Sequence, residues 1–190
     1  MKNAIIGNLA KFGPVSRALA VAIAVASATA PGALAADSDV ARSAEGIKIA
    51  PVTLNLKGLN KASVGLGSYL VTVAQCNGCH TSPEFAPGFD PFQGDPKTEV
   101  VKAHYFAGGV FFGGTLCSRN ITPDKNGLPD GLTLAHFISA MQTGHDFRDK
   151  PKILLQTMPW PYFRDMTVGD LTAVYDYLKA LPPEPEPKCP

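Results

Sequence analysis

Two cysteines and a histidine stand within five consecutive residues of this chain, at Cys76, Cys79 and His80. Cysteines three apart lie on the same side of one helical turn, so both thiols can reach one edge of a bound group. The next residue then projects over its face. This is the pattern of c-type haem attachment, in which the thiols add across two vinyl groups and the histidine meets the iron. The motif predicts one haem c per chain, bound covalently by Cys76 and Cys79, with His80 as an axial ligand.

Four other uses of these cysteines need to be weighed against haem. A structural zinc site expects further cysteines or histidines in close pairs, whereas Cys117 and Cys189 stand singly and far apart in the chain. A four-cysteine iron–sulfur cluster meets the same objection. A thioredoxin-type pair expects a strand before the first cysteine, but here a helical pattern precedes it and prolines follow. A plain disulfide between Cys76 and Cys79 is the fourth alternative.

The second axial ligand is sought among the methionines and histidines. The apolar helical face before Met141 accounts for that residue, and Met166 can staple onto a following helix, so the core explains both. Met158 lies in a proline-rich loop where no helical face explains a thioether. We predict Met158 as the sixth iron ligand, with a histidine or an open position as the alternatives. The histidines considered are His145, His104 and His136.

Two further residues are weaker candidates for contacts with the haem. Trp160 and Arg119 carry donors that can hydrogen-bond the haem propionates, although a half-exposed tryptophan and a solvated arginine are equally ordinary. We retain both as candidate propionate contacts.

Helical periodicity indicates the elements that must position these residues. Apolar residues recur at helical spacing from Gly65 into the motif, and a second such face is bounded by Thr133 and Gly144. A third helix begins at the capping-box-like pair Thr167 and Asp170. Prolines and glycines interrupt residues 81–131, which we predict to be loop with a brief extended piece at 110–112.

The first 35 residues have the composition of an export signal. Three basic residues and no acidic residue accompany an apolar run over 18–30, and the small-residue site Ala33-Leu34-Ala35 follows. As a helix this run is about 20 Å long, short of the roughly 30 Å hydrocarbon core of a membrane. We predict cleavage near Ala35 or Ala36, and a periplasmic mature protein without an integral membrane segment.

Export also bears on the two remaining cysteines. Free thiols do not persist in an oxidising compartment, and the haem vinyl groups account only for Cys76 and Cys79. Cys117 and Cys189 are therefore predicted to form a disulfide, with a free or intermolecularly bonded Cys189 as the alternative.

Composition restricts the class of protein. Hydrophobic residues make up 45% and charged residues 17% of the 190 positions, which fits one ordinary domain and excludes disorder over the whole length. Lysine and arginine number 17 against 16 aspartates and glutamates, so the chain lacks the dense positive charge that binds a phosphate backbone. Nucleic acid is not an expected partner.

From Gly65 to about Leu181 the chain resembles a class I c-type cytochrome of the single-haem kind. The attachment motif, the loop that begins at Met158 and the apolar stripe of the closing helix carry this resemblance. Residues 118–124 are also similar to the cytochrome subunits of bacterial periplasmic dehydrogenases. The resemblance implies an all-α class I cytochrome c fold, with three to four short helices and long loops around one covalently bound haem. It also implies that the first and last helices cross.

The expected organisation is a signal peptide over 1–35, an extended N-terminal arm over 36–62, a cytochrome c domain over 63–182 and a Pro-rich tail over 183–190. Iron held between histidine and methionine has no open position and suits outer-sphere electron transfer. We expect a one-electron carrier, not an enzyme, that passes electrons from a periplasmic dehydrogenase towards a terminal acceptor of a respiratory chain. A five-coordinate haem enzyme or gas sensor, and a structural subunit of a larger oxidoreductase, are the alternatives.

Overall fold

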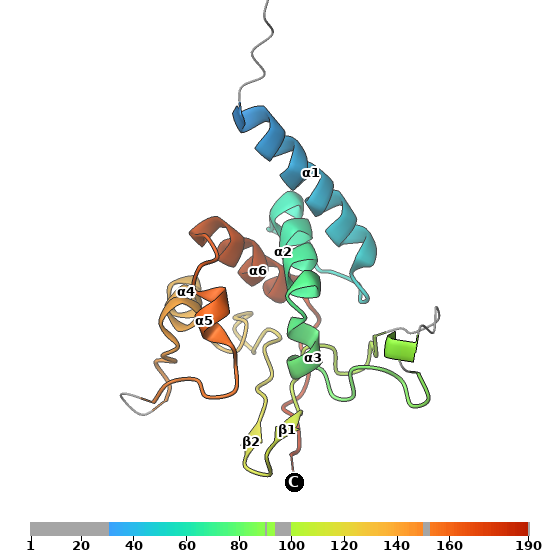
Figure 1. Cartoon of the computed structure of the whole chain (residues 1–190), viewed down its shortest axis with the longest axis vertical. Helices are drawn as coiled ribbons and strands as arrows, with labels where there is room; N and C mark the ends of the chain where they lie inside the picture. Colours follow the sequence, from blue (N-terminus) through green and yellow to red (C-terminus); the bar gives the residue numbers. More distant parts are fainter. Residues whose placement is uncertain (1–30, 90, 94–99, 150–152, 190) are drawn as a thin grey trace, which may run out of the picture.

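The computed structural model describes residues 31–89, 91–93, 100–149 and 153–189 of the chain. Most of the expected signal peptide lies outside the described residues. Within them the chain is mostly helical, with two short strands, and no helix is both long and apolar enough to cross a membrane. In chain order the elements are α1 (Pro31–Ile49), α2 (Lys61–Val73), α3 (Cys76–His80), the 3-10 helix η1 (Pro91–Gln93), β1 (Phe111–Phe112), β2 (Leu116–Cys117), α4 (Leu134–Thr143), α5 (Trp160–Phe163) and α6 (Val168–Ala180) (Figure 1).

The crossing of α2 and α6 forms the centre of the core (Figure 1). A Cβ added to Gly67 of α2 would lie 1.9 Å from the carbonyl oxygen of Ala173 and 2.8 Å from the Cβ of Tyr177, both in α6. The two backbones therefore approach to a separation that only glycine permits. Tyr177 is fully buried at this crossing. The first and last helices of the expected cytochrome domain thus cross, as anticipated.

The expectation of an extended N-terminal arm over 36–62 is wrong for its first part, because α1 continues to Ile49. The segment has no sustained apolar period, but it packs closely against α2. A Cβ on Gly46 would lie 1.8 Å from the carbonyl oxygen of Gly65, and a Cβ on Gly65 would lie 2.2 Å from that of Ser43. Close backbone packing, which periodicity does not record, explains the helix. The cleavage expected near Ala35 or Ala36 falls within α1.

The starts of α4 and α6 agree with their predicted caps. Thr133 accepts a hydrogen bond from the backbone N–H of His136 at the start of α4. Thr167 and Asp170 form a reciprocal capping box at the start of α6. Gly144 ends α4 with a φ of +72°, which favours glycine.

The helix expected from Gly65 begins earlier, at Lys61, because a side chain caps it there. The side-chain oxygen of Asn60 accepts the backbone N–H groups of Ala62 and Ser63, at 2.9 and 3.3 Å. This bonding satisfies donors that the first turn of a helix leaves free.

The described part of residues 81–131 is loop, apart from η1 and a short antiparallel pair of strands. β1 pairs with β2 in the register Phe111 to Cys117 and Phe112 to Leu116. The extended piece predicted at 110–112 is therefore present, as β1. Gly113 in the intervening turn has a φ of +56°.

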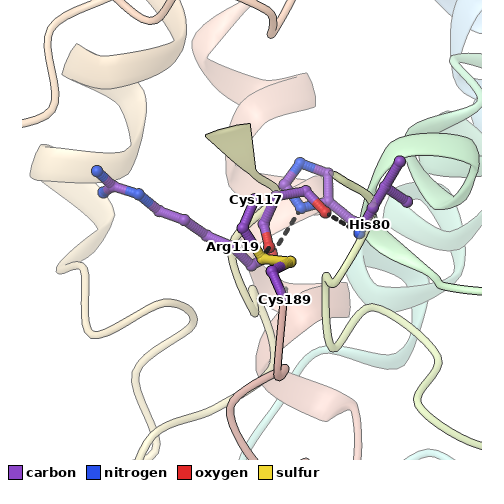
Figure 2. The surroundings of a disulfide bond; sticks show 6 residues. His80, Cys117, Arg119 and Cys189 are labelled. Atoms are coloured by element: carbon purple, nitrogen blue, oxygen red, sulfur yellow. Dashed lines mark hydrogen bonds between the residues drawn. A yellow bond between two sulfur atoms is a disulfide. The ribbon is translucent and has the colours of Figure 1, made fainter. Parts of the chain in front are cut away.

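The Pro-rich tail runs back along the loop that follows β2. The structure contains the predicted disulfide between Cys117 and Cys189, with the two Cα atoms 6.0 Å apart. The Asn120 side-chain amide also donates to the carbonyl of Glu184 at 2.7 Å, and the Glu184 N–H donates to the Thr122 hydroxyl at 3.0 Å. The tail thereby holds the 117–122 segment in place through these hydrogen bonds and through the disulfide, which Figure 2 shows.

The crossing of α2 and α6 predicts that Gly67→Ala destabilises the protein. The added Cβ would overlap the backbone of α6, which is costly to move, and we expect a loss of about 1–3 kcal/mol in the free energy of unfolding. Gly169→Ala is the matched control, because its Cβ would find its nearest neighbour at an ordinary 3.6 Å. Alanine favours helix by up to ~1 kcal/mol over glycine, so the control should be neutral or stabilising. Urea unfolding followed by circular dichroism measures both, and equal effects would contradict the steric explanation.

The disulfide predicts a single cross-linked peptide when the protein is digested without reduction. It joins residues 72 apart in the chain, and closing a loop of that size stabilises the folded state by about 4 kcal/mol in the chain-entropy description. The double variant Cys117→Ser with Cys189→Ser should therefore unfold at a lower urea concentration. Recovery of both residues as alkylated thiols in the unreduced wild type would disprove the bond.

Candidate haem site

The short helix α3 carries the three motif residues on little more than one turn. It begins after Gln75, whose φ of +55° separates it from α2. Cys76 and Cys79 are free thiols and are partly buried. Cys76 packs against the core. Two unbridged thiols on one side of a helical turn are what attachment to two vinyl groups requires.

The electrostatics of the two thiols differ from those of a redox-active pair. Burial, with a smaller contribution from Cys79, raises the pKa of Cys76 to about 12. Burial, followed by the nearby Glu84 carboxylate, raises the pKa of Cys79. Thioredoxin-type cysteines instead have a lowered pKa, because their surroundings stabilise a thiolate. The structure therefore does not favour the thioredoxin alternative.

The His80 ring is oriented by one backbone carbonyl. Its Nδ1 lies 2.9 Å from the carbonyl oxygen of Arg119 (Figure 2). A carbonyl can only accept, so Nδ1 carries the hydrogen and Nε2 keeps a free lone pair. Burial lowers the pKa of His80, while the Arg119 hydrogen bond and the charge of Asp130 act in the opposite direction. A neutral imidazole with a fixed tautomer is the form that ligates iron.

The backbone around His80 is held by residues from the following loop. The Gly108 N–H donates to the His80 carbonyl at 2.7 Å. The next residue, Thr81, is fully buried, and its hydroxyl accepts the Phe106 N–H at 3.1 Å. Both the ring and the main chain of His80 are therefore fixed by segments distant in sequence.

The metal alternatives do not fit the arrangement of the cysteines. A four-cysteine iron–sulfur cluster is excluded because Cys117 and Cys189 are bonded to each other. Among the described residues, no three histidine, cysteine, aspartate or glutamate side chains cluster in a way that could hold a metal ion. Cys76 and Cys79 are not joined as a disulfide. The donor set on α3, two thiols and one neutral imidazole nitrogen, fits haem c.

The structure separates the candidate sixth ligands only in part. Met141 is buried in the core, as its position on the apolar face of α4 predicts. Met158 and Met166 are both partly buried and both pack against the core. Met158 lies just before α5, and its carbonyl accepts the Trp160 N–H at 2.8 Å. Met158 as an iron ligand therefore stays a prediction.

The three histidines weighed as alternatives are exposed and have other neighbours. His104 Nδ1 lies 3.5 Å from a Glu184 carboxylate oxygen. The His136 ring stacks on Phe147, with the ring centres 4.0 Å apart. His145 Nδ1 lies 3.3 Å from the Ile153 carbonyl.

Trp160 and Arg119 are the two candidate propionate contacts, and each has partners within the protein. The Trp160 ring lies against Gly144, where an added Cβ would come within 2.3 Å of the indole. The Arg119 guanidinium is paired with Asp146 at 2.6 Å and with Asp149 at 2.5 Å. A propionate role for these two residues stays a prediction.

No pattern in the sequence predicts the ion-pair network centred on Asp146. Its side chain is only 4% exposed and binds both Arg119 and Arg148, and Arg148 also binds Asp130 at 2.6 Å. Burial alone would raise the pKa of Asp146, but hydrogen bonds from Arg148 and the two arginine charges outweigh it and hold the pKa below its usual value. Asp146 follows a helix-ending glycine, and no periodic pattern marks it as a buried carboxylate.

Comparison with known proteins finds similarity to cytochrome subunits. The chain is 30% identical over 121 residues to the cytochrome c subunit of alcohol dehydrogenase (quinone) from Gluconacetobacter polyoxogenes, and equally to that from Komagataeibacter europaeus. Identity to the corresponding Gluconobacter oxydans subunit is 27% over 121 residues. These matches cover 62% of this chain, which spans about a fifth of the length of these relatives, 22%, 22% and 21% respectively. No family model and no solved structure matches the chain at a significant level.

Proposed function

We propose that this chain is a periplasmic class I c-type cytochrome that carries one haem c and transfers single electrons for a dehydrogenase. The hydrogen bond from His80 Nδ1 to the Arg119 carbonyl carries the proposal, because it leaves Nε2 available to iron beside two free thiols. The similarity to cytochrome c subunits supports the same conclusion independently of this geometry.

Each residue of the site has a distinct proposed role. Cys76 and Cys79 would hold the group by thioether bonds, and His80 and Met158 would supply one axial ligand each. When bound, haem c supplies an iron that changes its oxidation state by one electron. A methionine ligand and apolar surroundings both favour ferrous iron and so raise the reduction potential. If His80 and Met158 both hold the iron, electron transfer would be favoured over chemistry on a bound substrate.

Trp160 and Arg119 are proposed to contact the propionates. The Arg119 side chain is 39% exposed and uses two of its nitrogens on Asp146 and Asp149. A guanidinium has five N–H donors, so donors remain for a further anion. The indole N–H of Trp160 is a donor of the same kind.

The proposed electron donor is a periplasmic dehydrogenase. The relatives are named as cytochrome c subunits of alcohol dehydrogenase (quinone), and this name supports a dehydrogenase as the partner that would supply electrons to this chain. The leader over 1–35 would direct the chain to the periplasm. That oxidising compartment also suits the disulfide between Cys117 and Cys189.

Covalent attachment is tested by the intact mass of the mature protein. We expect the mass to exceed that of the polypeptide by one haem, and the haem to resist extraction with acidified acetone, because thioether bonds survive acid. The double variant Cys76→Ser with Cys79→Ser is the control and should show the polypeptide mass alone. A wild-type protein that loses its haem to acid acetone would disprove thioether attachment.

The sixth ligand is tested by Met158→Ala. If the Met158 sulfur binds iron, the ferric wild type shows a weak far-red sulfur-to-iron absorption band, and the variant lacks it. The variant should also have a lower reduction potential, since water or hydroxide in place of a thioether stabilises ferric iron. The reduced variant should bind carbon monoxide, whereas the reduced wild type should not.

Met141→Leu and Met166→Leu are the controls for this experiment. Both are nearly isosteric apolar substitutions that cost less than about 1.5 kcal/mol and should leave the far-red band unchanged. Loss of the band in Met166→Leu would transfer the ligand role to Met166. Carbon monoxide binding by the reduced wild type would instead favour the five-coordinate enzyme or sensor.

A further inference from the structure

Arg119 makes two kinds of contact. Its backbone carbonyl faces the His80 ring, and its side chain belongs to an ion-pair network. Its carbonyl lies 2.9 Å from His80 Nδ1. Its guanidinium Nη1 lies 2.6 Å from Asp146, and Nη2 lies 2.5 Å from Asp149. The side chain extends away from His80, so it holds the peptide from the far side (Figure 2).

Asp146 is a firm anchor for the Arg119 side chain. Its carboxylate is 4% exposed. It also accepts the backbone N–H and the Nε–H of Arg148, each at 2.9 Å. These bonds hold Asp146 whether or not Arg119 is present. A planar guanidinium that bridges two carboxylates has less freedom than a side chain held at one point.

Gly108 packs against the same peptide. A Cβ on Gly108 would lie 2.4 Å from the Ser118 carbonyl oxygen and 2.6 Å from that of Arg119. The acceptor of the His80 hydrogen bond therefore sits directly against the Gly108 backbone. Because Gly108 packs closely against this peptide and the guanidinium is anchored, the Arg119 peptide has little room to shift.

We propose that Arg119 is a positioning residue for His80, acting through its ion pairs with Asp146 and Asp149. This inference rests on the proposed function, in which His80 ligates the haem iron. A well-placed acceptor on Nδ1–H raises the electron donation of the imidazole to iron. It thereby stabilises ferric iron and lowers the reduction potential. Loosening the Arg119 side chain should weaken that hydrogen bond and raise the potential.

The test is Arg119→Lys in the haem-loaded full-length mature protein. Lysine keeps the positive charge but cannot bridge both carboxylates. Because Arg119 is also a proposed propionate contact, exchange of the His80 Nδ1–H proton is the deciding measurement and the reduction potential is the supporting one. We expect NMR to show that the His80 Nδ1–H proton exchanges with solvent roughly tenfold faster, because its hydrogen bond to the Arg119 carbonyl is weakened. The reduction potential should rise. Asp149→Ala removes one of the two partners and should accelerate the exchange less.

Arg148→Lys is the matched control. Arg148 also binds Asp146, but its peptide is not the acceptor of the His80 bond, and its backbone N–H still holds Asp146 in the variant. We expect it to leave both the exchange rate and the potential at their wild-type values, even if it lowers thermal stability. If the network had only a structural role, Arg119→Lys and Arg148→Lys would change the exchange rate and the reduction potential alike.

The outcomes separate this inference from the proposed function. Haem-loaded variants in which Arg119→Lys and Arg148→Lys behave alike would overturn the positioning role and leave the cytochrome assignment intact. Should Arg119→Lys fail to mature, unchanged exchange in Asp149→Ala would overturn it as well. A wild-type protein without covalent haem would overturn both proposals. Faster exchange and a raised potential in Arg119→Lys alone support the positioning role.

Discussion

The hydrogen bond from the His80 ring to the Arg119 carbonyl joins the haem motif to a loop 39 residues further along the chain. A five-residue helix such as α3 has too few internal hydrogen bonds to fix the orientation of the His80 ring by itself. The ring therefore takes its tautomer and direction from the Arg119 peptide. That peptide is in turn held by the disulfide at Cys117, by tail contacts at Asn120 and by the Arg119 ion pairs.

The crossing of α2 and α6 is connected to the site by contacts from Tyr177 of α6 to Tyr105 and Phe106. The Tyr177 hydroxyl of α6 donates to that of Tyr105 at 3.2 Å, and both side chains are buried. Phe106 is fully buried and lies edge-on to Tyr177, with the ring centres 6.3 Å apart. These contacts fix the loop from which Phe106 binds Thr81 and Gly108 binds the His80 carbonyl. Close helix packing at Gly67 and the orientation of the His80 ring thus belong to one connected structure.

Features that depend on neighbouring residues were predictable from the sequence. The placement of Cys76, Cys79 and His80 on one helical turn follows from the helical repeat alone. The capping box of α6 follows from hydrogen bonds between residues three apart. The pairing of Cys117 with Cys189 is a long-range contact, but it was predictable because only two cysteines remained once the motif was assigned. Met158 as the axial ligand remains a prediction, because packing treats it and Met166 alike.

Other features depend on contacts between segments that are distant in the sequence, and no local pattern connects such segments. The helix α1 stands where an extended arm was expected, because close approach at Gly46 and Gly65 stabilises a segment of weak periodicity. Arg119 stays a candidate propionate contact, and no local pattern indicates that its side chain also binds Asp146 and Asp149 from a loop about 30 residues away. The sequence by itself determined where two thiols and an imidazole stand together, and hence the proposal of haem attachment, since that chemistry resides in adjacent residues. Only the tertiary structure decided what holds His80 in place, because the energy of that arrangement comes from contacts between distant loops.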